Sequence, residues 1–152
     1  MDERLTVGQV LRMAVEREMQ AVQFYTQLAL RAEDPAMKDL YHRLAEEEFR
    51  HKSRLEMEML KEGLVVEKLG RLDEVGDADY AAELALPADA QYKDLVEIGV
   101  EKERRAFRLY TRLAGVVSDR STRQVLFELA EEEARHMVQF ESESNRLAAK
   151  ER

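Results

Sequence analysis

The chain contains an internal repeat with a fixed offset of 85 residues. Residues 15–51 align without a gap with residues 100–136, and 16 of these 37 positions are identical. The most similar part is an eight-residue motif, which reads LAEEEFRH at 44–51 and LAEEEARH at 129–136. Two units are too few for a solenoid, in which each repeat packs only on its neighbours. The repeat therefore predicts two related halves that pack against each other about a pseudo-two-fold axis.

Helical periodicity covers both halves. Apolar residues recur at steps of three and four, and a composition with only six glycines and two prolines in 152 residues favours long helices. We therefore predict four long helices, at residues 5–32, 35–61, 92–117 and 120–149. The Asp34-Pro35 and Ser118-Asp119 pairs mark short turns between successive helices, so each half is expected to be an antiparallel hairpin.

Residues 62–91 interrupt the helical pattern. They contain three glycines, Pro87 and an acidic run around 73–79, which favour a connection over a packed helix. The segment is long for a plain loop but suits a crossover between the ends of a bundle, with room for a short helix near 79–86. The predicted architecture is an all-α four-helix bundle of two repeated hairpins. Residues 1–152 are expected to form a single domain. Within it, repeat one spans about 5–61, the crossover about 62–91 and repeat two about 92–149.

Composition also limits the function. The chain has no cysteine, which excludes disulfides, zinc–thiolate sites and iron–sulfur ligation within the chain, and fits a cytoplasmic location. The net charge of −8 argues against nucleic acid as a partner. No apolar run approaches the roughly 20 residues that span a bilayer, and the N-terminus lacks a signal-peptide pattern. We therefore expect a cytoplasmic protein that binds neither nucleic acid nor membrane.

Each copy of the repeated motif holds a Glu-x-x-His pair. The two pairs are Glu48 with His51 and Glu133 with His136. Residues at i and i+3 lie on one face of a helix, so the carboxylate and the imidazole of a pair can point at the same spot. Steps of three and four from the apolar Leu44 reach Glu48 and His51, which predicts that the pair faces the core. The neighbouring Glu46 and Glu47 fall outside this apolar stripe.

One further glutamate of each repeat, Glu18 or Glu103, lies on the apolar stripe of the preceding helix, and no Lys or Arg shares these stripes. Buried carboxylates are rarely left unpaired, because desolvating each ion costs several kcal/mol. Four carboxylates and two imidazoles are what two divalent cations require, and this is the ligand set of di-iron and di-manganese bundles. The predicted metal ligands are Glu18, Glu48, His51, Glu103, Glu133 and His136. Such oxygen-rich ligands favour iron, with manganese as the alternative.

The repeat also suggests how the ligands divide between the two ions. Each Glu-x-x-His pair is expected to serve one ion, with Glu18 and Glu103 completing or bridging the two. Tyr25 and Tyr110 follow these glutamates by seven residues on the same helix face. One interpretation is that both tyrosines are aromatic residues of the core. The other is that they belong to the catalytic site and that their hydroxyls hydrogen-bond a ligand carboxylate, and the two roles are compatible. His42 lies about half a turn round the helix from His51 and is predicted to be a surface residue.

The pattern Glu18-x-x-Ala21-x-x-x-Tyr25 with Glu48-x-x-His51 occurs in both repeats. In this pattern the chain resembles the rubrerythrin branch of the ferritin-like superfamily, over most of its length. The resemblance implies a ferritin-like four-helix bundle with a carboxylate-bridged di-iron centre, usually in a homodimer. It also implies redox chemistry with peroxide or O2 in a reducing cytoplasm.

Two features depart from the rubrerythrins. Those proteins carry a cysteine-ligated rubredoxin domain that supplies electrons, so this cysteine-free chain is expected to use a separate small redox protein. They also carry an additional Glu ligand on the third helix, whereas the positions one turn either side of Glu103 are Val100 and Ala106. The implied function is a di-iron or di-manganese oxidoreductase of the peroxidase or oxidase type, which reduces peroxide or O2. The alternative is an iron-binding or iron-buffering protein without turnover.

Overall fold

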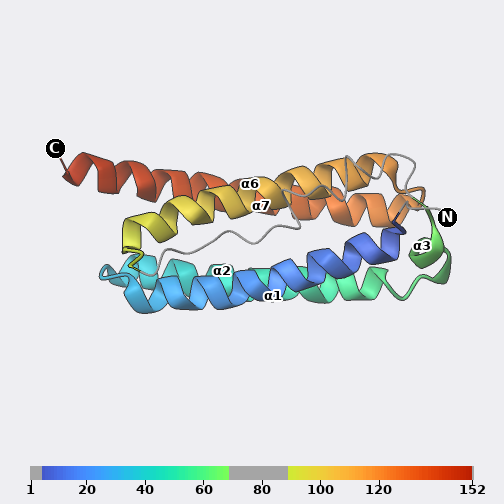
Figure 1. The fold of residues 1–152 in the computed structure, drawn as a ribbon, viewed down its shortest axis with the longest axis horizontal. Coiled ribbons are helices and arrows are strands. Elements are labelled where there is room, and N and C mark those ends of the chain that lie inside the picture. Colours follow the sequence, from blue (N-terminus) through green and yellow to red (C-terminus); the bar gives the residue numbers. More distant parts are fainter. Residues whose placement is uncertain (1–4, 69–88, 152) are drawn as a thin grey trace.

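The computed structural model describes residues 5–68 and 89–151, which are helical and contain no strand apart from one isolated β-bridge. The helices are α1 (Val7–Arg31), α2 (Pro35–Glu58), α3 (Glu62–Val66), α6 (Tyr92–Val116) and α7 (Arg120–Lys150). Helices α1 and α2 form one antiparallel hairpin, α6 and α7 form the other, and the hairpins lie along each other (Figure 1). The predicted all-α bundle of two hairpins is confirmed. None of the described helices is long and apolar enough to cross a membrane.

Local sequence signals explain where the long helices begin. The Thr6 hydroxyl accepts a hydrogen bond from the Gln9 backbone N–H, and the Gln9 side chain accepts one from the Thr6 backbone N–H, which is a capping box for α1. Asp34 caps α2, whose first residue is Pro35. Asp119 caps α7 in the same way. The ends of all four long helices lie within three residues of the sequence-based boundaries.

The short helix α3 is an element that the sequence pattern did not predict. It turns the chain back onto the start of α1, where the Val7 backbone N–H donates to the Glu67 carbonyl at 2.8 Å. Gly8 makes the contact possible, because a Cβ at this position would lie 2.8 Å from Cγ1 of Val65. The short helix expected near 79–86, and most of the crossover, lie outside the described residues.

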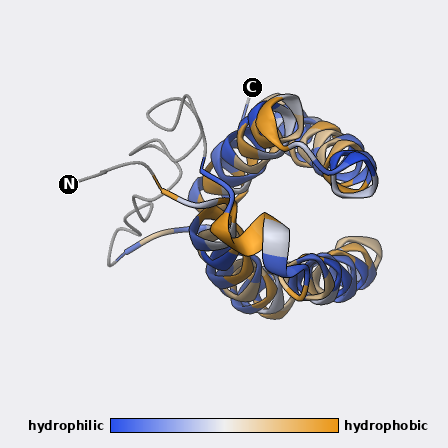
Figure 2. Ribbon diagram, turned by 90° about the vertical axis from the view of Figure 1, so that its right-hand side faces the viewer, coloured by the Kyte–Doolittle hydropathy of each residue, from blue (hydrophilic) through white to orange (hydrophobic). Residues whose placement is uncertain are grey.

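Two hydrophobic clusters fill the interior of the bundle. The cluster nearer α3 includes Val10, Leu113 and Leu129, and the cluster at the other end includes Tyr41 and Phe140. Figure 2 looks along the bundle and shows that each long helix carries both hydrophobic and hydrophilic residues, as amphipathic helices do. The interior between the two clusters is where the predicted ligands lie.

Gly99 allows α6 to approach the ring of Phe140. A Cβ at position 99 would lie 2.6 Å from Cε1 of Phe140. The repeat-equivalent positions hold Ala14, which is larger than Gly99, and Leu55, which is smaller than Phe140. The two repeats therefore fill equivalent space with different pairs of side chains.

Gly99→Ala is expected to destabilise the protein by about 1–3 kcal/mol, because it overpacks a filled core. The same substitution is expected to cost much less in a Phe140→Leu background, where the ring no longer occupies that space. Chemical denaturation of the two single variants and the double variant measures the coupling between the two sites. Additive effects would show that the two side chains do not compete for the same space.

Candidate metal centre

Six side chains from the four long helices converge in the middle of the bundle. Each of them is at most 2% exposed. They are Glu18 of α1, Glu48 and His51 of α2, Glu103 of α6, and Glu133 and His136 of α7. The structure thus brings together every residue that the sequence predicts as a ligand, whereas His42 is exposed, as expected.

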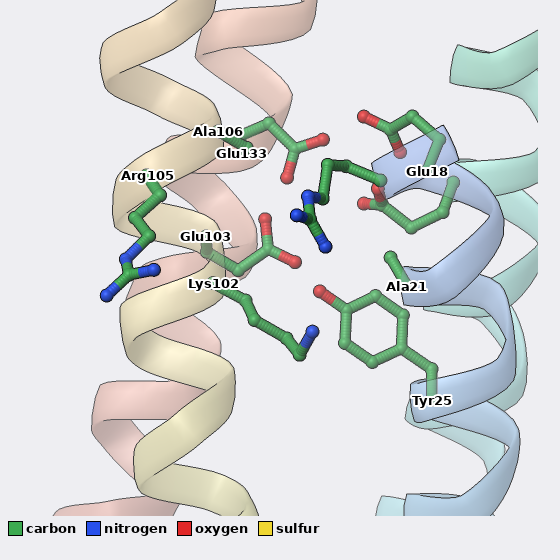
Figure 3. A pocket seen from close by; sticks show the side chains of 10 residues that line it. Glu18, Ala21, Tyr25, Lys102, Glu103, Arg105, Ala106 and Glu133 are labelled. Carbon is green, nitrogen blue, oxygen red and sulfur yellow. The ribbon is translucent and has the colours of Figure 1, made fainter. Parts of the chain in front are cut away.

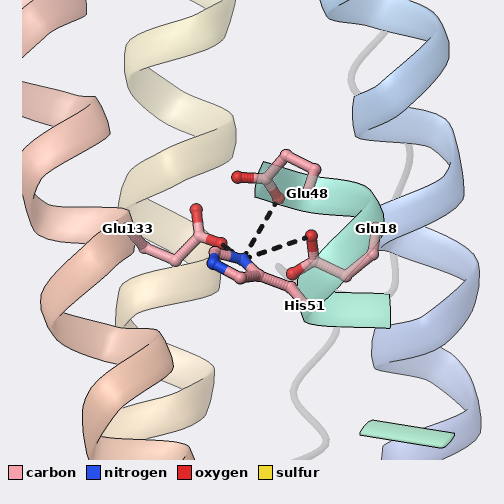
Figure 4. Close-up of side chains that lie close together, drawn as sticks. All are labelled: Glu18, Glu48, His51 and Glu133. Atoms are coloured by element: carbon pink, nitrogen blue, oxygen red, sulfur yellow. Dashed lines mark hydrogen bonds and ion pairs between the residues drawn. The ribbon is translucent and has the colours of Figure 1, made fainter. Parts of the chain in front are cut away.

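His51 faces three carboxylates. Its Nδ1 atom lies 2.8 Å from Oε1 of Glu133 and 3.7 Å from an oxygen of both Glu18 and Glu48 (Figure 4). These residues come from both hairpins. The group of four is therefore assembled only when the two halves of the chain pack together.

His136 has an equivalent environment, related to the first by the repeat. Its Nδ1 atom lies 2.8 Å from Oε1 of Glu48, 3.7 Å from Oε2 of Glu103 and 3.8 Å from Oε2 of Glu133. The imidazole rings of His51 and His136 are nearly parallel, with centroids 5.9 Å apart. The site thus has the approximate two-fold symmetry that the repeat predicts.

Two carboxylates belong to both groups. One group is Glu18, Glu48, His51 and Glu133, the other is Glu48, Glu103, Glu133 and His136, and the candidate ligand atoms of each lie within 4.8 Å of one another. Glu48 and Glu133 are therefore placed to bridge two cations, while Glu18 and Glu103 each face one. Each Glu-x-x-His pair lies in its own group, as in the sequence-based division, but the carboxylates common to both groups are Glu48 and Glu133 and not Glu18 and Glu103.

The site contains buried polar atoms that have no hydrogen-bond partner among the described residues. These atoms are Oε2 of Glu18, Oε2 of Glu103, Oε2 of Glu133 and the hydroxyl oxygen of Tyr25, whereas Oε1 of Glu48 and Nδ1 of His136 lie 2.8 Å from each other. Leaving such a group unpaired costs about 1–3 kcal/mol, and more when it is charged. Because these orphaned atoms gather at one place and are ligand types for iron or manganese, the residues fit a pair of divalent cations.

Burial raises the pKa of all four carboxyl groups of the site. Repulsion between neighbouring carboxylates raises it further for Glu18, Glu48 and Glu133. Burial, followed by the charge of Glu48, raises the pKa of Glu133 to about 7. Burial also raises the pKa of Glu18, Glu48 and Glu103. For the two histidines, burial opposes protonation, but hydrogen bonds with the surrounding carboxylates outweigh it and raise the pKa of both imidazoles. Without a cation, the site therefore retains protons in its place.

Two further glutamates support the histidines from the opposite hairpin. Nε2 of His51 lies 2.5 Å from Oε2 of Glu132, and Nε2 of His136 lies 2.5 Å from Oε2 of Glu47. A carboxylate at Nε2 holds the proton there and leaves Nδ1 to bind a metal. The spacing of apolar residues predicts that Glu47 lies outside the core-facing stripe, and its side chain is 37% exposed. The signal that points to these residues is their identity at equivalent positions of the repeat.

Glu132→Ala is expected to weaken metal binding by roughly 10–100-fold, because it removes the partner that orients His51. A competitive metal titration measures the change. Glu131→Ala is the matched control, because Glu131 is exposed and its substitution removes the same charge from α7. Equal loss of affinity in both variants would attribute the effect to surface charge and not to the histidine.

The repeat-related tyrosines have different surroundings. The Tyr110 hydroxyl donates a hydrogen bond to Oε1 of Glu18, across the two hairpins. The Tyr25 hydroxyl is equally buried but has no hydrogen-bond partner among the residues described, and it points into a cavity between α1 and α6 (Figure 3). The cavity is lined by the four site glutamates, Tyr25, Ala21, Ala106, Arg17, Lys102 and Arg105. A hydrogen bond to a ligand carboxylate, expected for both tyrosines, is thus present for one.

Comparison with known proteins assigns the chain to a family. The sequence profile described as Rubrerythrin matches residues 9–144. The chain belongs to the rubrerythrin family. Among solved structures, it is similar to a hypothetical protein from Pyrococcus furiosus, with 21% identity, a TM-score of 0.71, and coverage of 95% of this chain and 91% of that one. A comparison with curated protein sequences found no match.

Membership of the rubrerythrin family and the geometry of the site lead to the same conclusion. The family supports a carboxylate-bound two-metal centre, and the buried glutamates and histidines are arranged as two ligand groups. The resemblance implies an additional Glu one turn from Glu103, but the positions one turn either side hold Val100 and Ala106, and the nearby Glu101 is paired with Arg104 and Arg105. This rubrerythrin-family site therefore offers four carboxylates from the described residues, and not five.

Proposed function

We propose that this chain is a non-haem di-iron carboxylate protein that reduces peroxide or O2 with electrons from a separate donor. The observation that carries the proposal is the sharing of Glu48 and Glu133 by two otherwise separate ligand groups. Shared carboxylates hold two cations side by side, and reduction of peroxide requires two electrons at one place. Iron bound at both positions would supply that two-electron chemistry.

The chain's own residues would bind and orient the reacting groups. Tyr110 fixes one oxygen of Glu18, and Glu47 and Glu132 fix the two imidazole rings. The near-complete burial of the ligands excludes bulk water, which limits side reactions of reactive species. The cavity beside Ala21 and Ala106 gives a small molecule such as peroxide room next to the carboxylates.

Further parts of the proposal concern the partners. Because the chain has no cysteine, electrons are proposed to come from a separate small redox protein and not from a rubredoxin-type centre in the same chain. A homodimer and a location in the cytoplasm are proposed from the family resemblance. Manganese in place of iron is compatible with the same ligands.

A second candidate function is iron binding or buffering without turnover. The specific observation in its favour is the absence of the additional carboxylate, since Val100 and Ala106 occupy the positions one turn either side of Glu103. A site with fewer carboxylates is less able to stabilise the oxidised ions that peroxide chemistry produces. The two functions differ in whether the centre can be reduced again after it has been oxidised.

The test combines metal analysis with redox cycling. Protein purified from its native host is expected to contain two iron ions per chain. After anaerobic reduction, repeated additions of peroxide with a chemical reductant are expected to give many turnovers per chain. A single oxidation followed by no re-reduction would favour the buffering function, and a protein without bound metal would exclude both.

A further inference from the structure

Four aromatic side chains form a continuous path from the metal centre to the surface. Tyr25 lines the site cavity, and its ring centroid lies 5.5 Å from that of Phe140. Phe140 stacks on Tyr41 with centroids 5.9 Å apart, and Tyr41 lies 6.3 Å from Tyr92. The first three residues are at most 1% exposed, whereas Tyr92 is half-buried and reaches a surface pocket. We refer to Tyr25, Phe140, Tyr41 and Tyr92 as the aromatic path.

The surface end of the aromatic path has an acceptor for a phenolic proton. The hydroxyl oxygens of Tyr41 and Tyr92 are 2.6 Å apart, and the Tyr92 hydroxyl donates to Oε2 of Glu143 at 2.6 Å. Burial opposes ionisation of Glu143, but hydrogen bonds from Arg146 and Tyr92 outweigh it and hold the pKa of this carboxyl group below its usual range. Glu143 is therefore a carboxylate at neutral pH and can receive a proton from Tyr92.

The aromatic path takes residues from both hairpins but exists at only one end of the described bundle. The repeat-equivalent positions of Phe140, Tyr41 and Tyr92 hold Leu55, Leu126 and Val7, all of them buried. Aliphatic side chains thus fill the equivalent space, so packing alone does not require aromatic rings there. Burying phenol groups is also unfavourable unless they are hydrogen-bonded. The asymmetry indicates that the rings serve a purpose other than filling the core.

We propose that the aromatic path carries electrons from a one-electron donor at the surface to the metal centre. The proposal rests on the proposed function, because it requires a site that consumes electrons. In each step Tyr92 loses one electron toward the site and its hydroxyl proton to Glu143. The surface donor then returns the electron, and Glu143 returns the proton. Two such steps supply the two electrons that, with two protons from solvent, reduce one peroxide molecule to two water molecules.

Each residue of the aromatic path has a defined part in this step. Tyr92 is oxidised and then reduced again. Tyr41 contacts the Tyr92 ring from the interior side, and the hydroxyl groups of the two residues are hydrogen-bonded. Phe140 is too difficult to oxidise to hold a charge itself, so it bridges the gap between Tyr41 and Tyr25. Gly99 leaves the room that the ring of Phe140 needs.

The test injects an oxidising equivalent at the surface end and does not need peroxide. Because the chain has no cysteine, Lys150→Cys allows a single ruthenium photo-oxidant to be attached beside Tyr92, in the same surface pocket. The protein is loaded anaerobically with ferrous ions, and a cobalt(III) ammine is added as an electron acceptor. A light flash excites the ruthenium label, and the cobalt complex irreversibly takes an electron from it. The oxidised label is expected to produce a transient tyrosyl radical, followed by ferric absorption from the site.

The decisive variants interrupt the aromatic path without opening a cavity. Gly99→Ala with Phe140→Leu copies the Ala14 and Leu55 pair of the other repeat, and Tyr92→Phe removes only a hydroxyl. Both are expected to bind iron normally and to slow the appearance of ferric absorption by an order of magnitude or more. Phe24→Leu is the matched control. Its ring lies 5.7 Å from that of Tyr25 but is not part of the aromatic path, so this variant is expected to keep the original rate.

The proposal is overturned if iron-loaded protein oxidises its ferrous ions at the same rate in the wild-type background and in both interrupted variants. It is also overturned if Phe24→Leu slows the reaction as much as they do. Failure of the proposed function gives a different result: the protein binds iron and passes the flash test but does not consume peroxide.

Discussion

His51→Ala and His136→Ala are each expected to lose one bound metal ion per chain, whereas His42→Ala is expected to keep both. Each of the first two substitutions removes the single nitrogen atom from one ligand group, because His51 and His136 belong to different groups. His42 is exposed and lies on the other side of α2. The approximate symmetry of the site predicts similar damage from the two ligand substitutions.

The expected loss of activity is larger than the loss of metal. Reduction of peroxide requires two electrons at one place, so a site with one remaining ion is expected to lose this chemistry entirely. Metal per chain and the rate of oxidation by peroxide are the two measurements, made on the three variants in parallel. If His42→Ala lost metal while His51→Ala kept two ions and the full rate, the assignment of the core-facing side of α2 would be wrong.

The sequence contained enough information to predict the architecture, for a physical reason. An ungapped repeat keeps the helical register, so apolar steps that place Glu48 and His51 on the core-facing side of one helix also place Glu133 and His136. The capping residues Thr6, Asp34 and Asp119 then define where three helices begin. Local rules alone are therefore sufficient for the four long helices and for the six buried polar residues at the centre of the site.

The contacts between the two hairpins could not be predicted in this way. The hydrogen bonds of Glu47 and Glu132 with the histidines depend on how closely α2 and α7 approach, which no spacing within one helix determines. The shared position of Glu48 and Glu133 depends on the same approach. The different surroundings of Tyr25 and Tyr110 are also hidden, because the repeat makes the two residues equivalent in sequence.

Removing the metal is expected to lower the melting temperature at neutral pH and to reverse its pH dependence. A ligand present at about 1,000 times its dissociation constant adds roughly 4 kcal/mol of stability. For a chain of this size that corresponds to a shift on the order of 10 °C. In the metal-loaded protein, protons compete for the ligands, so stability is expected to fall as the pH falls.

The metal-free protein is expected to become more stable as the pH falls from about 7 towards 4.5. Burial and the charge of Glu48 raise the pKa of Glu133 from 4.5 to about 7, so the folded chain binds this proton more tightly than the unfolded chain does. The raised pKa values of His51 and His136 act in the same direction, since their contribution to stability is complete below 6.5. The pKa values of Glu47 and Glu132 are lowered, but the stability they contribute is lost only below about 4.5, outside this window.

Glu133→Gln provides the sharpest form of this prediction, because it removes a charge from the site while keeping the shape of the side chain. In the metal-free protein it is expected to raise the melting temperature at pH 7 and to flatten the dependence on pH. In the metal-loaded protein the same substitution is expected to lower the melting temperature at pH 7, because a bridging ligand is lost. Glu131→Gln, at an exposed neighbouring position, is expected to change neither. Melting curves with and without chelator between pH 5 and pH 8 measure all four cases. Identical melting temperatures with and without chelator across that range would contradict a buried metal site.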